Sequence, residues 1–117
     1  MSRLVIIIFA RLNSKRLKGK VLKKIFNNYL LEIVYLRLKK NLNIPIIVNT
    51  SKNKSDDLLV KFCKKKKIKF FRGSLNNVFL RTTMCLKKNK FNGFIRVCAD
   101  RPFVDFREIK KAIKIFK

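Results

Sequence analysis

The 117-residue sequence predicts an α/β fold in which a mostly parallel sheet is covered by helices on both faces. Short apolar runs rich in Ile, Val and Phe alternate along the chain with longer segments in which apolar residues recur at helical spacing. The short runs lack regular polar alternation, which is typical of strands buried on both faces. The length suits one domain spanning residues 1–117, and no linker or second-domain boundary interrupts it.

The first part of the chain is expected to hold two buried strands joined by a basic loop and a helix. Residues 3–9 form the first strand, and the second strand spans Ile46–Asn49. Between them a helix is predicted from about Val21 to Lys40. Its apolar face is formed by Leu22, Ile25, Phe26, Tyr29, Leu30, Ile33, Val34 and Leu36.

A second helix is predicted to follow, with Ser55 as its cap and Asp56 and Asp57 at its positive N-terminus. Its inner face is expected to comprise Leu58, Leu59, Phe62 and Cys63. Lysines 64–67 lie at its C-terminal end, where cations are favourable. They are interpreted as a solvated helix end rather than as a patch that binds nucleic acid.

The last third continues the alternation. A strand is expected at Ile68–Phe71, a helix near Asn77–Lys88 and a fourth strand at Phe94–Ala99. Asp105, followed three residues later by Glu108, is typical of a capping box and predicts a last helix.

The net charge of +25, from 31 basic and 6 acidic residues, predicts attraction to polyanions such as nucleic acid, nucleotides or an anionic membrane. A compositional explanation competes with this one. The chain is rich in Lys, Asn, Ile and Phe, whose codons are A- and T-rich, so genome composition accounts for the larger share of the bulk charge.

The sequence disfavours a membrane-spanning protein, a secreted protein and a protein with a structural zinc site. No apolar run approaches the ~20 residues of a membrane span, and no small-residue cleavage site follows the first strand, so a cytoplasmic protein is expected. Cys63, Cys85 and Cys98 are widely spaced and the chain has no histidine, which disfavours a structural zinc site. Free and mostly buried thiols are the expectation.

The loop after the first strand, FARLNSKRLKGKVL at residues 9–22, has the chemistry of an anion site. In open α/β sheets ligands bind beyond the carboxyl ends of the strands, where this loop begins. Arg11 and Arg16 supply bidentate hydrogen-bond donors, and Lys20 supplies a mobile positive charge. Ser14 supplies a hydroxyl, and Gly19 allows a ligand to come close to the backbone. Neither the Walker A nor the G-x-G-x-x-G pattern fits, and a solvated basic turn is the competing interpretation.

The pattern A-R-x-x-S-x-R-L-x-G-K-V-L resembles the loop of sugar-acid cytidylyltransferases, above all their spore coat polysaccharide biosynthesis branch. Further segments resemble that branch in the same order, so the resemblance covers nearly the whole chain. They are LLEIVYLRLK, IIVNTS, DDLLVKFCKKKKIKFFRGS and RVCADRPFVD.

The resemblance implies a Rossmann-like nucleotide-diphospho-sugar transferase fold, and a Mg²⁺-dependent reaction of CTP with a sugar or sugar acid that releases pyrophosphate. By the family pattern Arg11 and Lys20 hold the CTP phosphates and Asp100 holds Mg²⁺, and these three are the catalytic candidates. The nucleotide-binding candidates also include Ala10, Ser14, Arg16, Gly19, and Thr50 or Ser51 near the base or ribose. The competing interpretation of Asp100 is a turn residue before Pro102.

Several departures accompany the resemblance. Phe9 replaces a glutamine, Lys18 a proline and Ala99 a glycine, while Asn77 and Leu80 occupy positions where the branch has acids. The chain resembles only the N-terminal, nucleotide-binding half of the family fold. A homodimer, or a partner chain that supplies the other half, is therefore one expectation. The alternatives are a catalytically inactive nucleotide-binding remnant and a small basic nucleic-acid-binding protein.

Overall fold

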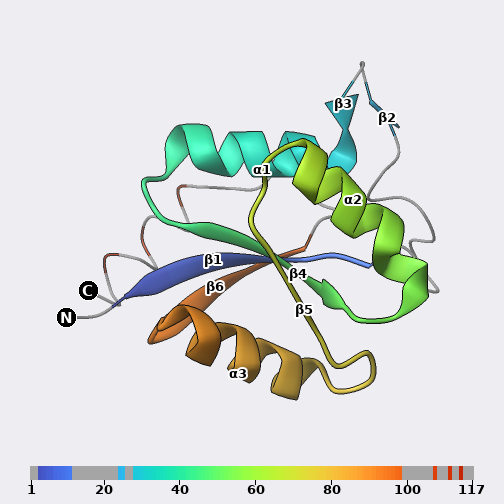
Figure 1. The fold of residues 1–117 in the computed structure, drawn as a ribbon. Coiled ribbons are helices and arrows are strands. Elements are labelled where there is room, and N and C mark those ends of the chain that lie inside the picture. The colour runs from blue at the N-terminus through green and yellow to red at the C-terminus, as the bar shows by residue number, and fades with distance from the viewer. Residues whose placement is uncertain are drawn as a thin grey trace.

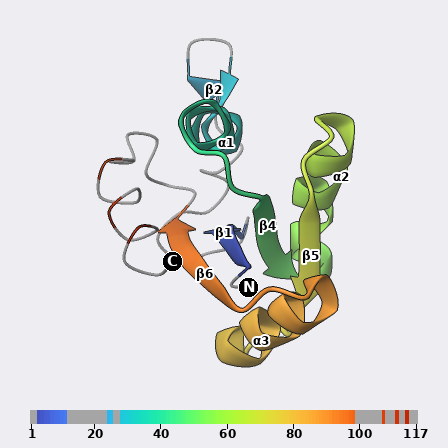
Figure 2. The same cartoon turned by 90° about the vertical axis from the view of Figure 1, so that its left-hand side faces the viewer.

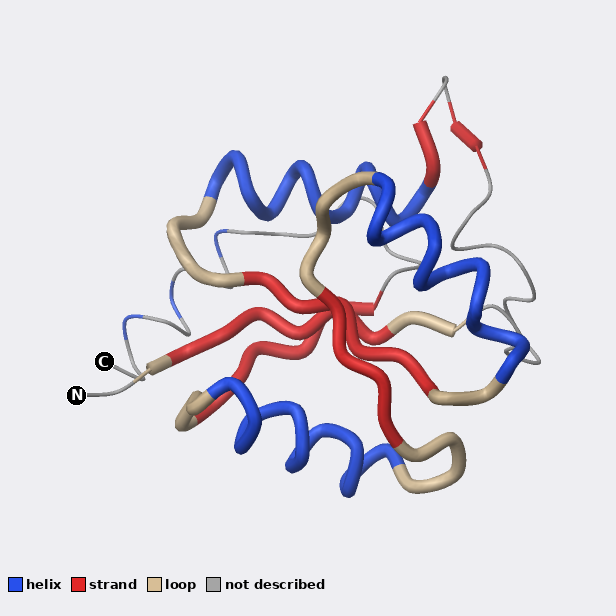
Figure 3. Tube along the Cα trace, viewed as in Figure 1, coloured by secondary structure: helices blue, strands red, loops and turns tan. Residues whose placement is uncertain are grey.

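The computed structural model describes residues 3–11, 24–25 and 28–98, together with residues 107, 111 and 114. Its centre is a four-stranded sheet in the order β5-β4-β1-β6. The strands are β1 (Leu4–Phe9), β4 (Ile46–Ser51), β5 (Phe70–Gly73) and β6 (Gly93–Cys98). All three pairings are parallel, with Ile7 of β1 opposite Ile47 on one side and Arg96 on the other. The predicted parallel sheet is confirmed, and Figure 3 shows its strands in red at the centre of the fold.

Helices cover both faces of the sheet, as the sequence predicts. Helices α1 (Leu30–Asn41) and α2 (Asp57–Lys65) lie on one face, and α3 (Val78–Asn89) lies on the other (Figure 1). Figure 2, turned by 90°, shows α1 and α3 on opposite sides of the sheet. Among the described residues, no helix is long and apolar enough to span a membrane.

Both faces of β1 are buried, because successive residues of this strand face different helices. Ile6 and Ile8 belong to a cluster that also contains residues of α1 and α2, whereas Val5 and Ile7 pack with Cys85 of α3. This explains why β1 is apolar throughout instead of alternating. Strand β6 is less covered, because Phe94 and Arg96 are exposed, so the expectation of two buried faces is wrong for this strand.

The predicted helix from Val21 to Lys40 is only partly correct. Residues Lys24–Ile25 (β2) pair antiparallel with Asn28–Tyr29 (β3), and helix α1 begins at Leu30. In strands this short, apolar residues recur at spacings that also fit a helical turn. The apolar period alone therefore does not distinguish a strand from a helix here.

The start of α2 also differs from the prediction. Ser55 does not cap the helix but lies inside a short 3₁₀ helix, η2 (Lys54–Asp56), whose cap is Asn53. The Asn53 side chain accepts hydrogen bonds from the backbone N–H and the hydroxyl of Ser55, at 2.9 and 2.8 Å. This extra turn rotates α2 so that Leu58 is exposed, and Leu59, Val60, Phe62 and Cys63 form the inner face.

The remaining elements lie close to their predicted positions. Strand β4 continues to Ser51, β5 begins two residues later than expected, and α3 begins at Val78. Asn77 caps α3 by accepting a 2.9 Å hydrogen bond from the backbone N–H of Leu80, a role that asparagine and aspartate share. Cys63 and Cys85 are free and buried, and lysines 64–67 are exposed, as expected. The predicted capping box at Asp105 and Glu108 lies outside the described residues.

Candidate functional site

The carboxyl ends of β1 and β4 meet at one edge of the sheet and bring four predicted site residues together. The backbone N–H of Ala10 donates to the carbonyl of Asn49 at 3.1 Å, so the end of β1 is fixed beside the end of β4. Arg11 follows Ala10 directly in the chain, and Thr50 and Ser51 follow Asn49. Ala10, Thr50 and Ser51 are buried, and Arg11 is partly exposed. Ligands of open α/β sheets bind at this edge.

Arg11 is held by a buried carboxylate that the sequence did not single out as a site residue. Its Nε lies 3.1 Å from Oδ2 of Asp56, which is fully buried. The hydroxyl of Ser51 donates to the same carboxylate oxygen. One of the two hydroxyls expected near the base or ribose is therefore engaged with Asp56.

Thr50 differs from its neighbour. Its side chain is fully buried, and its Oγ1 has no hydrogen-bond partner in the part of the chain that the structure describes. A buried hydroxyl without a partner is uncommon in folded proteins. Thr50 is therefore the residue of this pair whose hydroxyl is not engaged by a described side chain.

Arg72, at the end of β5, fixes the segment that carries Ser51 and Asp56. Its Nε donates to the carbonyl of Ser51 at 2.8 Å, and its Nη2 donates to the carbonyl of Asn53 at 2.9 Å. The same Nη2 lies 2.8 Å from Oδ1 of Asp57. Through these bonds one guanidinium ties β5 to the loop after β4 and to the first turn of α2.

A second guanidinium is buried beneath the site. Arg81 of α3 is 2% exposed, and its Nε donates to the amide oxygen of Asn49. Its Nη1 donates to the carbonyl of Ser74 at 3.1 Å. Burial lowers the pKa of Arg81, the positive charge of Arg11 lowers it further, and the carboxylate of Asp56 raises it. Two arginines and one carboxylate thus interact here, which leaves net positive charge at the edge of the sheet.

Comparison with known proteins assigns the chain to a family. The sequence matches the family described as Cytidylyltransferase over residues 5–117. The chain belongs to the cytidylyltransferase family. The resemblance seen in its sequence motifs is thereby confirmed.

Two curated relatives illustrate how much of such a protein this cytidylyltransferase chain spans. It is 34% identical over 110 residues to the spore coat polysaccharide biosynthesis protein SpsF of Bacillus subtilis (strain 168), covering 90% of this chain and 46% of SpsF. It is 30% identical over 111 residues to the 3-deoxy-manno-octulosonate cytidylyltransferase of Fusobacterium nucleatum subsp. nucleatum, covering 95% and 45%. The chain therefore spans about half the length of these relatives.

A solved structure extends the likeness to the fold. A cytidylyltransferase from Leptospira borgpetersenii serovar Hardjo-bovis superimposes with a TM-score of 0.90 at 26% identity. The match covers 98% of this chain and 49% of the Leptospira chain. The predicted nucleotide-diphospho-sugar transferase fold, in the form of its N-terminal half, is confirmed.

The structure does not describe all the residues that the family pattern singles out. Ser14, Arg16, Gly19, Lys20 and Asp100 lie outside the described residues, so their predicted roles stay predictions. Within the described ranges there is no group of three or more acidic, cysteine or histidine side chains that could hold a metal ion. Asp56, although it is an acid at the sheet edge, is already engaged with Arg11 and Ser51.

Asp56, Arg72 and Arg81 are charged residues near this edge that sequence reasoning missed. Asp56 is adjacent to Asp57, and both acids were interpreted as favourable charges at a helix start. Arg81 lies in an amphipathic helix, where an arginine is usually solvated. A signal was nevertheless present for Asp56, because it is one of only six acids in a chain with 31 cations.

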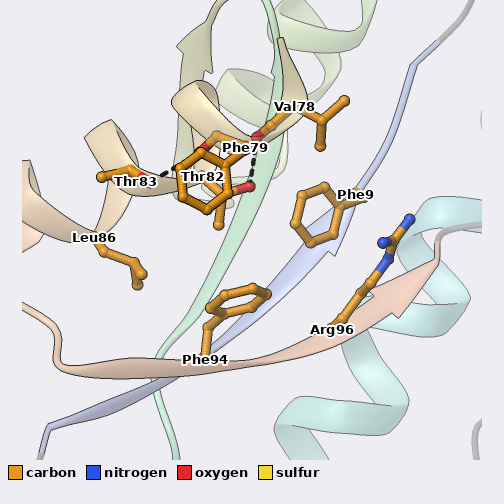
Figure 4. Close-up of a pocket in the computed structure, with 8 residues that line it drawn as sticks. All are labelled: Phe9, Val78, Phe79, Thr82, Thr83, Leu86, Phe94 and Arg96. Carbon is orange, nitrogen blue, oxygen red and sulfur yellow. Dashed lines mark hydrogen bonds between the residues drawn. The ribbon is translucent and has the colours of Figure 1, made fainter.

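An apolar hollow of about 420 Å³ lies on the α3 face of the sheet, separate from the residues described above. Figure 4 shows the rings of Phe9 and Phe94 directed into it, with Phe79 of α3 opposite and Arg96 at the rim. The two rings lie 6.2 Å apart, and the Arg96 guanidinium lies 5.0 Å from the Phe9 ring centroid. Phe9, which replaces the glutamine of the spore coat branch, therefore faces apolar groups.

Proposed function

We propose that this chain forms the nucleotide-binding half of a cytidylyltransferase that joins CTP to a sugar acid and releases pyrophosphate. The observation that carries the proposal is the position of Arg11 at the carboxyl edge of the sheet, where its partner Asp56 also binds Ser51, in a chain of this family. A sugar acid fits the name of the Fusobacterium relative, and a role in surface polysaccharide synthesis fits the name of SpsF.

The proposed reaction is an attack by a sugar hydroxyl oxygen on the α-phosphorus of CTP. A bond forms between that oxygen and phosphorus, and the bond from phosphorus to the oxygen shared with the β-phosphate breaks, so that pyrophosphate leaves. The hydroxyl proton passes to water. Negative charge accumulates on phosphate oxygens, so fixed cations contribute most when they are in place beforehand. Arg11 would bind these oxygens together with Lys20. Asp100 would hold Mg²⁺, which would supply positive charge to the phosphate groups.

The first test is a thermal melt of the chain followed by circular dichroism. We expect CTP with MgCl₂ to raise the melting temperature, because a ligand present at 100 times its Kd stabilises the folded state by about 2.7 kcal/mol. A random-sequence oligonucleotide at equal ionic strength is the comparison. A rise with the oligonucleotide and none with CTP would favour the nucleic-acid-binding alternative.

Arg11→Ala tests whether Arg11 binds the nucleotide at this edge of the sheet. We expect it to reduce the shift with CTP, whereas Arg3→Ala removes the same charge at the opposite end of β1 and is expected to retain the full shift. Equal loss in both variants would indicate bulk charge instead of a site. Melts with UTP and GTP test the base, and CMP-sugar formation by the chain with its complementary half tests catalysis.

A further inference from the structure

We infer that Asp56 is a positioning residue that aims the guanidinium of Arg11 at a phosphate group of the nucleotide. The inference rests on the proposed function, because it assigns a task to Arg11 within that site. It adds a residue that the family pattern did not single out in this sequence. Three contacts carry it: Arg11 with Asp56, Asp56 with Ser51, and Arg72 with the loop between them.

The ion pair with Asp56 uses Nε of Arg11 and does not involve its two terminal nitrogens. A guanidinium has five N–H donors, of which the paired terminal nitrogens match a phosphate bidentately. Asp56 is contacted through Nε, at 3.1 Å. The two terminal nitrogens of Arg11 have no hydrogen-bond partner within the described ranges, and the side chain is 27% exposed. Asp56 therefore fixes the side chain without occupying its terminal nitrogens.

The carboxylate is itself fixed. Asp56 is fully buried, and its Oδ2 accepts from both Arg11 and the hydroxyl of Ser51. The backbone N–H of Asn53 donates to that hydroxyl at 3.2 Å, and Arg72 binds the carbonyls of Ser51 and Asn53. A connected set of hydrogen bonds therefore runs from β5 through the loop after β4 to Arg11.

Electrostatics alone would oppose a carboxylate at this position. A negative charge beside a phosphate site repels the ligand, so removing it should tighten binding if Asp56 only neutralises the site. If Asp56 positions Arg11, the same change should weaken binding, because Arg11 loses its orientation. The two roles therefore predict changes of opposite sign.

The test is Asp56→Asn, which conserves shape and removes the charge, measured by titration calorimetry of the variant chain with CTP and MgCl₂. Asp57→Asn is the matched control, because it makes the same change of net charge at the neighbouring position, where the carboxylate is paired with Arg72 and half exposed. We expect roughly five- to ten-fold weaker binding for Asp56→Asn. For Asp57→Asn we expect unchanged or slightly tighter binding.

A double-mutant cycle separates positioning from a general structural role. If Asp56 acts through Arg11, adding Asp56→Asn to the Arg11→Ala variant should change the affinity by less than about two-fold. Affinity equal to or tighter than that of the unmodified chain in Asp56→Asn would overturn the inference. So would a further loss in the double variant equal to the loss in the single variant.

Failure to fold does not remove the test. If circular dichroism shows Asp56→Asn to be unfolded, Ser51→Ala replaces it, since this change keeps the carboxylate and removes one of its hydrogen bonds. We then expect roughly three- to ten-fold weaker CTP binding, and unchanged affinity would overturn the inference. If the unmodified chain itself does not bind CTP, the proposed function fails, which is a different outcome.

Discussion

A Cβ atom on Gly73 would lie 2.7 Å from Cγ of Arg81, closer than side chains normally approach. The glycine ends β5, and its bare Cα gives the stem of Arg81 room to cross it toward Asn49 and Ser74. The absent side chain of one residue therefore sets the path of a buried cation beneath the candidate site.

Gly73→Ala is expected to destabilise the chain by about 1–3 kcal/mol, because either Arg81 or the ring of Phe71, 3.1 Å from the same point, must shift. The free energy of unfolding, from urea titration followed by circular dichroism, measures this. In an Arg81→Ala background the methyl group meets fewer atoms, and we expect the cost to fall. An equal cost in both backgrounds would show that Arg81 is not the obstacle.

Lys90→Gly is expected to stabilise the chain. Lys90 ends α3 in the left-handed conformation, with φ at 59°, which costs a residue with a Cβ about 1 kcal/mol relative to glycine. Its backbone N–H, which bonds to the carbonyls of Leu86 and Lys87, is retained. We expect a gain of about 0.5–1 kcal/mol in the free energy of unfolding.

Lys87→Gly is the matched control for Lys90→Gly, because it removes the same side chain from within α3. There glycine is expected to lower the free energy of unfolding by about 1 kcal/mol. Effects of the same sign at both positions would show that backbone conformation is not the cause.

Stability is expected to fall with pH in the alkaline range because of Cys63. Burial raises the pKa of this thiol from 9.0 to about 12. Between these values the unfolded chain releases the proton and the folded chain keeps it, so the free energy of unfolding decreases as pH rises from about 9 toward 12. Below pH 9 the thiol contributes no pH dependence.

Cys63→Ala isolates this contribution, since lysines also titrate in the alkaline range. Urea titrations at pH 8, 9 and 10 should show a steeper loss of stability in the unmodified chain than in the variant. The variant is expected to be less stable overall, because it loses buried sulfur, and only the difference in slope bears on the pKa of Cys63. Equal slopes of stability against pH in the two proteins would contradict the raised pKa of Cys63.

Added NaCl is expected to raise the melting temperature. The net charge of +25 produces self-repulsion in the folded state, and about 0.1 M salt screens charges beyond ~10 Å. The described residues include three carboxylates, on Glu32, Asp56 and Asp57, and each forms an ion pair. Salt therefore weakens few attractive pairs while it screens many repulsive ones. A melting temperature that falls between 20 and 200 mM NaCl would contradict this expectation.

Much of the fold could be predicted because it follows from local patterns. The apolar run of β1 and the alternation of strands with helices were sufficient for the parallel sheet, since buried parallel strands are apolar on both sides. The pairing of β2 with β3 was missed because the apolar residues in this stretch of sequence also fit a helical period. The exposure of Leu58 follows from the 3₁₀ turn before α2, which the capping pattern at Ser55 did not reveal.

The candidate site was only partly predictable, because its decisive contacts are non-local. Arg11 was identified from its motif, but the carboxylate that holds it lies 45 residues away. Nothing in the sequence around Asp56 distinguishes it from Asp57, and yet one is buried and the other half exposed. The same holds for Arg81, whose partners belong to β4 and to the loop after β5.

The hollow between α3 and β6 affects how this chain should be assayed. Its lining includes Phe79, which is 82% exposed, so an environment-sensitive apolar dye has a place to bind before any unfolding occurs. Fluorescence from such a dye would begin high and respond weakly to heating. The chain also lacks tryptophan, which removes the usual intrinsic probe. Ellipticity is therefore the signal best suited to following its melting.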